Sequence, residues 1–265
     1  MDEHLLRKTL SNIPLGGLRY FERTGSTNDI ALAWAAEAAP DLALVYAEQQ
    51  MAGRGRAHHR WFTPAGAALA FSLVLRPLPG EQQSIPLFSA LGALAVCETL
   101  AMQGLQPEIK WPNDVLLNRR KVCGVLAESV WLGEKVESIV LGVGLNIKPM
   151  AVPPPELLDF PATCLETELP PPQHIIQTLE RAILLQKILQ SMLDWRSLIT
   201  ADIFLQAIER RLAFCGEQVE IWADGQVFRS GKVDGLDPDG SLRLLSPQGQ
   251  VFPVQFGEIH LRPVV

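Results

Sequence analysis

The chain has 265 residues and a net charge of −6, with 48% hydrophobic and 20% charged residues. This composition is typical of a soluble globular protein whose length allows either one large domain or a large and a small one. The negative charge argues against a nucleic-acid-binding protein with a basic surface. Because the four cysteines are spread singly, the sequence favours free thiols in a reducing compartment over disulfides or a zinc site.

The start of the chain is polar and acidic, without the basic and apolar regions of a signal peptide. The apolar run over residues 65–75 is too short to span a bilayer. We therefore expect a cytoplasmic protein with no membrane partner.

The first part of the chain alternates predicted strands and helices. The patterns predict a weak helix over 5–12, strands over 18–21, 42–47 and 67–75, and a buried helix over 85–102 with Pro86 in its first turn. Residues 24–29 form a polar turn, and its simplest interpretation is N-terminal capping of a helix that starts near Ile30. Together these elements predict an α/β or α+β layer.

Residues 48–61 contain two glycines, three arginines and a tryptophan without a helical or strand period, which predicts a loop that binds an anion. Gly53 and Gly55 allow the backbone to approach a ligand closely, and successive N–H groups in such a turn can surround an anion. Arg54 and Arg56 add forked donors that suit carboxylate or phosphate. Taken alone, the segment is equally compatible with an ordinary solvated basic turn.

Further along, residues 115–117 and 121–128 are typical of a hairpin, and residues 137–143 of another strand. Because Pro112 lacks a backbone N–H, we expect Asn113 and Asp114 to lie at the start of a strand, facing a cleft or solvent. Residues 149–172 contain two proline triplets, which predicts a long surface connection with little regular structure.

The last part of the chain changes in kind. It holds predicted helices over 173–193 and 202–211, and then predicted strands over 219–222, 227–233, 241–245, 251–254 and 259–261. Gly-containing turns at 224–225, 239–240 and 248–249 separate these strands. Short strands at this spacing predict a small barrel, with a domain boundary near residue 214.

Four separated stretches carry polar residues at predicted strand ends, namely 26–28, 50–61, 110–114, and Lys121 with Gly124. In their order and amino-acid sequence they resemble the biotin protein ligase family, most specifically in Gly-Arg-Gly-Arg, Lys-Trp-Pro-Asn-Asp and Gly-Val-Gly-Leu-Asn. The resemblance covers roughly residues 18–148 and the terminal strands. It implies an α+β catalytic core over 1–212, of the class II synthetase type with a mixed sheet flanked by helices, and an SH3-like β-barrel over 213–265.

The resemblance implies a reaction in two steps. Biotin and ATP form biotinyl-5′-AMP and pyrophosphate, and the biotinyl group then passes to a lysine of a biotin carboxyl carrier domain. Bringing a carboxylate to about 3.5 Å from a phosphate costs roughly 5 kcal/mol per pair of unit charges at an effective dielectric of about 20. Cations, Mg²⁺ among them, must therefore shield the substrates.

By resemblance, the catalytic residues are Arg54, Lys121, Asp114 and Lys110. The implied biotin-binding residues are Ser26, Thr27, Asn28, Gln50, Gly53, Arg54, Gly55, Arg56, Lys121 and Gly124. The implied ATP-binding residues are Arg54, Arg56, Trp61, Lys110, Asn113 and Asn146. Asp114 is the acidic candidate either for holding Mg²⁺ or for orienting the incoming lysine, and the sequence leaves both roles open.

The sequence departs from the family at residues 57–60, where Ala-His-His-Arg stands in place of the usual Arg-Gly-Arg-x. This departure puts the ordering of the loop and the retention of the adenylate in question, and Arg60 offers compensation by a shift of one position. The simplest interpretation of His58 and His59 is a pair of exposed loop histidines.

Three rival functions differ in class. A lipoate ligase or octanoyl transferase shares the core, but the Gly-Arg-Gly-Arg segment and the terminal strands favour the biotin branch. A DNA-binding repressor needs an N-terminal helix-turn-helix domain, for which about seventeen residues before Leu18 are too few. A biotin-binding sensor with weak turnover is the third. The sequence leaves a homodimer open.

Overall fold

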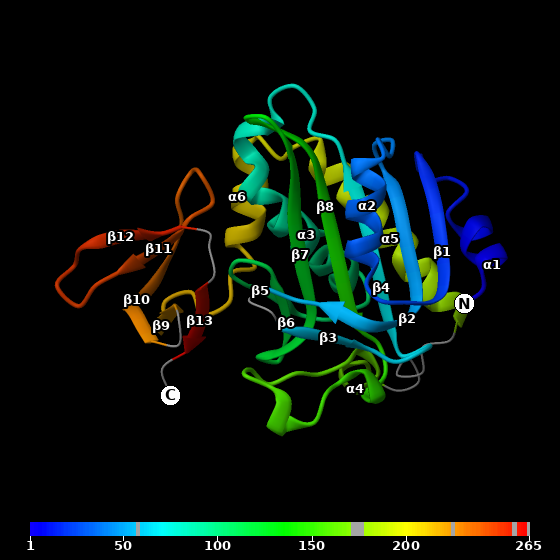
Figure 1. Ribbon diagram of the computed structural model, residues 1–265. Coiled ribbons are helices and arrows are strands. Elements are labelled where there is room, and N and C mark those ends of the chain that lie inside the picture. Colours follow the sequence, from blue (N-terminus) through cyan, green and yellow to red (C-terminus); the bar gives the residue numbers. More distant parts are fainter. Residues whose placement is uncertain (57–58, 171–177, 224–225, 256–258, 264–265) are drawn as a thin grey trace.

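The computed structural model describes residues 1–56, 59–170, 178–223, 226–255 and 259–263 (Figure 1). The helices are α1 Glu3–Thr9, α2 Thr27–Ala36, α3 Phe88–Ala101, α4 Leu165–Glu168, α5 Thr178–Arg196 and α6 Asp202–Glu209, with 3-10 turns η1 Glu81–Leu87, η2 Pro149–Ala151 and η3 Pro155–Leu157. The strands of the first sheet are β1 Gly17–Thr24, β2 Ala43–Arg54, β3 Arg60–Thr63, β4 Ala68–Leu75, β5 Pro107–Lys110, β6 Asp114–Leu117, β7 Arg120–Leu132 and β8 Lys135–Asn146. Those of the second sheet are β9 Gln218–Ala223, β10 Gln226–Leu236, β11 Leu242–Leu245, β12 Val251–Val254 and β13 Ile259–Pro263.

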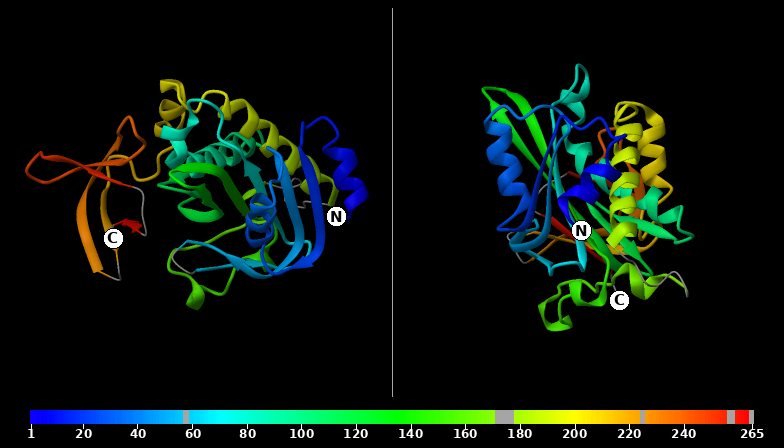
Figure 2. Two further views of the ribbon diagram at one scale, coloured as in Figure 1. Left: turned by 45° about the horizontal axis from the view of Figure 1, so that its top comes forward. Right: turned by 90° about the vertical axis from the view of Figure 1, so that its right-hand side faces the viewer.

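The first sheet is mixed and has the order β1-β2-β4-β8-β7-β6-β5, with β3 paired to β2. β1 runs parallel to β2, and the other pairs are antiparallel. One face carries α2, and the other is covered by α3 and α5, which pack against each other (Figure 1 and Figure 2). The predicted α+β architecture with a mixed sheet flanked by helices is therefore confirmed.

Continuous apolar strands form the centre of this sheet because helices cover both of its faces. All eight residues of β4 are buried, and so are most of those of β8, which pairs with it. The stretch Glu81–Ala101 is long and apolar enough to cross a membrane by length and composition, with a mean hydropathy of 1.6. However, 67% of that window is buried inside the protein, as expected of a core helix.

The predicted hairpin is confirmed, but the buried helix starts later than predicted. The hairpin between β6 and β7 turns at Asn118 and Arg119, both of which have positive φ, as a two-residue turn requires. Pro86, however, lies in the 3-10 turn η1, and the α-helix starts only at Phe88. Since proline has no N–H to donate, this boundary is where the regular helical ladder can begin.

The second sheet is antiparallel, in the order β12-β11-β10-β9-β13. Within the described residues no pairing joins β12 to β13, so the closed barrel and its SH3-like character stay predictions. The indole Nε1 of Trp111 donates to the carbonyl of Gly240 at 3.0 Å and so ties the first sheet to the second. The boundary at 212/213 also stays a prediction, and hydrogen bonds from Ile109 to Arg211 and from Ala213 to Ile109 lie beside it.

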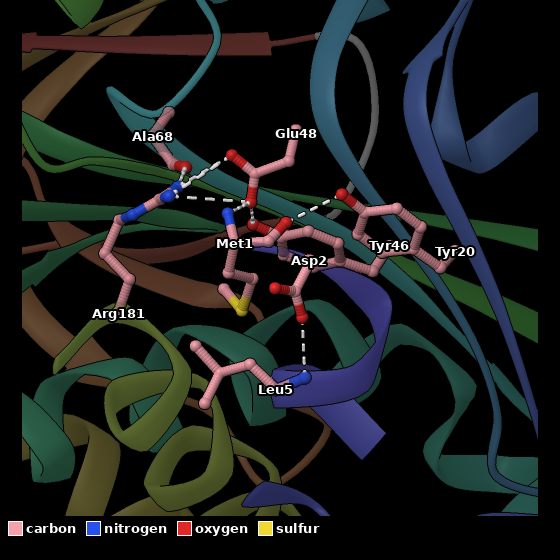
Figure 3. A network of polar contacts seen from close by, with 8 residues as sticks. All are labelled: Met1, Asp2, Leu5, Tyr20, Tyr46, Glu48, Ala68 and Arg181. Atoms are coloured by element: carbon pink, nitrogen blue, oxygen red, sulfur yellow. Dashed lines mark hydrogen bonds and ion pairs between the residues drawn. The ribbon is translucent and has the colours of Figure 1, made fainter. Parts of the chain in front are cut away.

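A polar network connects the N-terminal segment and α5 to β2 (Figure 3). Its centre is Glu48, which pairs with the ammonium group of Met1 and with Arg181 at 3.2 Å. Tyr46 donates to the same carboxylate at 2.7 Å, and Tyr20 donates to the carbonyl of Met1 at 2.6 Å. Burial and the charge of Glu48 raise the pKa of Tyr46 well above its usual value, so its hydroxyl remains a donor.

The hydrogen bond from Trp111 to Gly240 predicts a stability effect. Trp111→Phe removes the donor and leaves a buried carbonyl unpaired, so the free energy of unfolding in urea should fall by about 1–3 kcal/mol. Trp131→Phe is the control because Trp131 is 60% exposed. Equal unfolding curves for the two variants would show that the bond contributes nothing.

Candidate active site

A cavity of about 200 Å³ opens where the ends of β2, β7 and β8 meet the turn between β5 and β6. Of the predicted site residues, all but Gly53 line it: Ser26, Thr27, Asn28, Gln50, Arg54, Gly55, Arg56, Trp61, Lys110, Asn113, Asp114, Lys121, Gly124 and Asn146. Residues separated by more than a hundred positions in the sequence therefore meet around one space.

The Gly-Arg segment is not the loop that its sequence predicts. β2 continues to Arg54 and pairs with β3 through a bulge between Gln50 and Gly53. A Cβ atom on Gly53 would lie 2.4 Å from the carbonyl oxygen of Trp61, so glycine is needed there for strand packing. Only residues 55–59 connect the strands, and 57–58 lie outside the described residues. The reason for the difference is long-range, because β3 supplies the ladder that the segment's own pattern lacks.

At one end of the cavity a carboxylate lies between two ammonium groups. Asp114 begins β6, and its Oδ1 lies 2.7 Å from Lys121 Nζ on β7, while its Oδ2 lies 3.6 Å from Lys110 Nζ at the end of β5. The side chains of Asp114 and Lys110 are only 12% and 9% exposed. The expected position of Asp114 at a strand start facing a cleft is thus confirmed.

These charges shift one another's pKa values. Burial alone would raise the pKa of Asp114, but Lys121 and Lys110 outweigh it and hold that pKa below its usual value. Burial lowers the pKa of Lys110, and the charge of Asp114 offsets part of this effect. The carboxylate therefore remains charged at neutral pH and stabilises the ammonium of Lys110 beside it.

The two arginines of the segment lie in different surroundings. Arg54 points to the edge of the cavity, where its Nε is 2.9 Å from Asp29 and its Nη2 pairs with Glu128. Arg56 donates to the side-chain oxygen of Asn113 at 3.1 Å. Its charge also acts on Lys110 and Asp114. Arg56 rather than Arg54 thus lies with Asp114, Lys110 and Lys121, which we call the lysine–aspartate cluster.

At the other end of the cavity, neutral polar groups surround the start of α2. The helix starts at Thr27 rather than near Ile30, and Ser26 makes no side-chain capping bond. Instead, Gln50 Oε1 accepts from the amide of Thr27 at 2.8 Å. The predicted capping by residues 24–29 therefore holds in position, with Ser26 as the N-cap residue, but the side chain that accepts from the first helical amide comes from β2.

Asn28 is anchored from several sides. Its side-chain nitrogen donates to Glu128 at 2.8 Å and to the carbonyl of Leu126 at 3.4 Å, and its oxygen accepts from Ser72. Gly142 leaves the necessary space, because a Cβ there would lie 2.0 Å from the Asn28 oxygen. Sequence reasoning missed Ser72, which is a single serine within an apolar strand.

The indole ring of Trp61 covers glycines on the floor of the cavity. A Cβ on Gly144 would lie 2.3 Å from the ring, and one on Gly124 would lie 3.2 Å from it. Lys121 Nζ lies 5.6 Å from the ring centroid. Within the described residues, the buried Nε1 of Trp61 has no hydrogen-bond partner. A buried unpaired donor at a cavity wall suits a ligand acceptor.

The asparagines predicted for the nucleotide side are held by the backbone. Asn113 donates to the carbonyl of Val125, and Asn146 donates to the carbonyl of Thr163 at 3.1 Å. Both are buried. These bonds fix the planes of both side-chain amides at the wall of the cavity.

The proline-rich connection forms a wall of the site, which its sequence does not predict. Residues 151, 153, 157–160 and 162 line the cavity. Lys121 donates its backbone N–H to Pro161 at 2.7 Å and accepts from the amide of Thr163 at 2.9 Å. Lys110 Nζ lies 4.6 Å from the ring centroid of Phe160. The expected surface connection thus fixes the backbone of one site lysine and packs on the other.

Further lining comes from the second sheet and from His59, which follows the Gly-Arg-Gly-Arg segment. Leu261 and Arg262 of β13 line the cavity. His59 is exposed, as predicted, and its Nδ1 lies 3.5 Å from the carboxylate of Asp159 across the cavity mouth. His58 and its predicted exposure lie outside the described residues.

Asp114 does not fit a resident magnesium ion. Each of its oxygens faces a lysine ammonium, and within the described residues no group of three metal-ligating side chains occurs. Divalent cations in proteins are held mainly by carboxylate and carbonyl oxygens. A magnesium ion held by Asp114 would therefore compete with both lysines for the same two oxygens.

Comparison with known proteins identifies the family. The model of the biotin/lipoate A/B protein ligase family matches residues 20–146. A biotin–[acetyl-CoA-carboxylase] ligase of Paracoccus denitrificans is 34% identical over 87% of this chain and 95% of its own length. The chain belongs to the biotin/lipoate A/B protein ligase family. The resemblance seen in the sequence is thus confirmed.

Other members of the family extend the likeness. A bifunctional ligase/repressor of Bacillus spizizenii is 36% identical over 65% of this chain, and this chain spans 51% of that relative's length. The biotin protein ligase of Aquifex aeolicus, solved in complex with biotin and ATP, has a TM-score of 0.76 and 26% identity. That match covers 94% of this chain and 99% of the Aquifex chain.

The lysine–aspartate cluster predicts how stability depends on pH. The lowered pKa of Asp114 stabilises the fold above the ordinary aspartate pKa of about 3.9, and this contribution is lost as the pH falls through the native pKa. Asp114→Asn should destabilise the protein at pH 6, and its difference from wild type should shrink towards pH 3.

Urea unfolding between pH 6 and pH 3 measures this difference. Glu134→Gln is the control because Glu134 is exposed, and its difference from wild type should stay small at every pH in the range. A constant difference for Asp114→Asn as well would contradict the pairing described here.

Proposed function

We propose that this chain is an ATP-dependent biotin protein ligase. It activates biotin as biotinyl-5′-AMP with release of pyrophosphate, and it transfers the biotinyl group to a lysine of a biotin carboxyl carrier domain with release of AMP. The observation that carries the proposal is a single cavity with neutral hydrogen-bonding groups at one end and a cluster of cations at the other. Such a cavity matches a ligand that has a urea ring at one end and a carboxylate at the other.

The neutral end suits the urea ring because that ring carries no charge and both donates and accepts hydrogen bonds. Ser26, Thr27 and Gln50 lie there around the start of α2. The amide of Thr27 is already paired with Gln50, so the pair offers mainly side-chain oxygens to a ligand. Asn28 shapes the pocket beside them, because its amide nitrogen is occupied by Glu128 and Leu126.

The charged end suits the joining of two anions. Lys121 approaches the biotin carboxylate and the α-phosphate and stabilises the charge that develops as pyrophosphate leaves. Arg56 and Lys110 add positive charge from the neighbouring strands. Asp114 keeps both lysines in place and orients the carrier lysine in the second step, in which the lysine, as its neutral amine, attacks the acyl carbon of the adenylate and AMP leaves.

Arg54 has a separate role at the edge of the cavity. Asp29 and Glu128 hold its guanidinium there, within reach of an anion that enters. If Arg54 exchanged Asp29 and Glu128 for the phosphate of the adenylate, this ion pair would hold its guanidinium over the ligand. Trp61 and Asn146 then complete the nucleotide side, where the wall formed by residues 151–162 keeps water from the mixed anhydride.

The partners follow from the same chemistry. ATP enters as its magnesium complex, with the metal ion as part of the substrate. A carrier domain presents the acceptor lysine. The cysteines at 97, 123, 164 and 215 are free thiols, which suits a cytoplasmic location. A homodimer is compatible with this reaction, which needs residues from one chain only.

The test is transfer of labelled biotin to a carrier domain in the presence of ATP and magnesium. We expect label on the carrier lysine and release of pyrophosphate, with no label from lipoate or octanoate. Transfer of those acids instead would place the chain in the lipoate branch. Binding of biotin without pyrophosphate release would identify a sensor.

Substitutions at the charged end should reduce the rate of adenylate formation. Lys121→Ala, Arg56→Ala and Arg54→Ala each remove a cation, and loss of one such electrostatic group typically costs about a hundredfold in rate. Exposed Lys135 and Arg23 provide the controls Lys135→Ala and Arg23→Ala, which should retain the wild-type rate. Wild-type rates for Lys121→Ala would refute its role.

A further inference from the structure

Ser72 is a fully buried serine in the middle of β4, the most apolar strand of the first sheet. Its hydroxyl lies 2.5 Å from Asn28 Oδ1 and 2.8 Å from Thr27 Oγ1, both at the start of α2. It therefore connects two residues that line the neutral end of the cavity. Ser72 itself does not line the cavity.

The positions of the hydrogens follow from the chemistry of the groups. The side-chain nitrogen of Asn28 faces Glu128 and a carbonyl, which can only accept, so the atom facing Ser72 is the amide oxygen. That oxygen can only accept, and Ser72 must use its single hydrogen there. The contact between Ser72 and Thr27 then requires the hydrogen of the Thr27 hydroxyl.

This arrangement decides what faces the ligand. The single hydrogen of the Thr27 hydroxyl has two possible acceptors, Ser72 Oγ at 2.8 Å and Gln50 Oε1 at 3.0 Å. We place it on Ser72, which makes the shorter contact, so that Gln50 Oε1 accepts from the Thr27 amide alone and keeps a lone pair. The oxygens of Thr27 and Gln50 are then both acceptors for N–H groups of a ligand.

We propose that Ser72 is a positioning residue that turns the Thr27 hydroxyl so that the cavity presents acceptors to the N–H groups of a cyclic urea. The inference rests on the proposed function and deepens it. In Ser72→Ala, the Thr27 hydrogen turns to Gln50 and occupies that acceptor. Asn28 stays in place, because both hydrogens of its amide are held by Glu128 and Leu126.

The experiment is pyrophosphate release with biotin, ATP and a saturating carrier domain, measured at varied concentrations of biotin and of ATP. For Ser72→Ala we expect the KM for biotin to rise about fivefold to tenfold, the effect of one hydrogen bond, while kcat and the KM for ATP stay within twofold. Ser138→Ala is the matched control, since Ser138 is also fully buried and its hydroxyl has no partner among the described residues. Its KM for biotin should not change.

A double variant separates positioning from general damage to the fold. Thr27→Val removes the hydroxyl through which Ser72 acts, so Ser72→Ala added to Thr27→Val should change the KM for biotin by less than twofold. Additive effects of the two substitutions, or a Ser72→Ala variant that behaves like Ser138→Ala, would overturn the inference.

The remaining outcomes are also decisive. If Ser72→Ala does not fold, Ser72→Cys keeps a weak donor at similar size and should give an intermediate KM, whereas a wild-type KM would overturn the inference. Wild-type protein that releases no pyrophosphate with biotin would instead refute the proposed function.

Discussion

The site depends on one buried carboxylate held between two lysines. Without Asp114, the ammonium group of Lys121 would repel the buried one of Lys110, and the pKa of Lys110 would be lower still. With it, β5, β6 and β7 deliver a charged cluster that is already assembled before any anion arrives. Preorganised charge of this kind need not be rearranged during a reaction.

Much of the fold was predictable because it depends on local patterns. The apolar runs of β4 and β8 read as buried strands, and the turn at Asn118 and Arg119 lies where the hairpin pattern requires it. Convergence of the polar stretches rested on the resemblance to biotin protein ligases. Periodicity alone does not place Gln50 beside Thr27.

The missed features share a physical cause, which is dependence on partners distant in sequence. Ser72 carries no signal of its own in an apolar strand, and its role becomes visible only when α2 packs on β4. The proline-rich connection predicts irregular structure correctly, but its position as a wall follows from the backbone bonds around Lys121. Likewise, the glycine and arginine pattern does not show that β2 continues to Arg54, because the pairing partner of its last residues is β3.

The second sheet is part of the cavity. Leu261 and Arg262 of β13 supply part of its lining. Trp111, which lies between β5 and β6, donates a hydrogen bond to Gly240 in the turn between β10 and β11 of the second sheet. Replacing the second sheet would therefore change the lining of the cavity as well as the surface of the protein. A substitution in either β13 or the turn at Gly240 reaches the cavity through one of these two contacts.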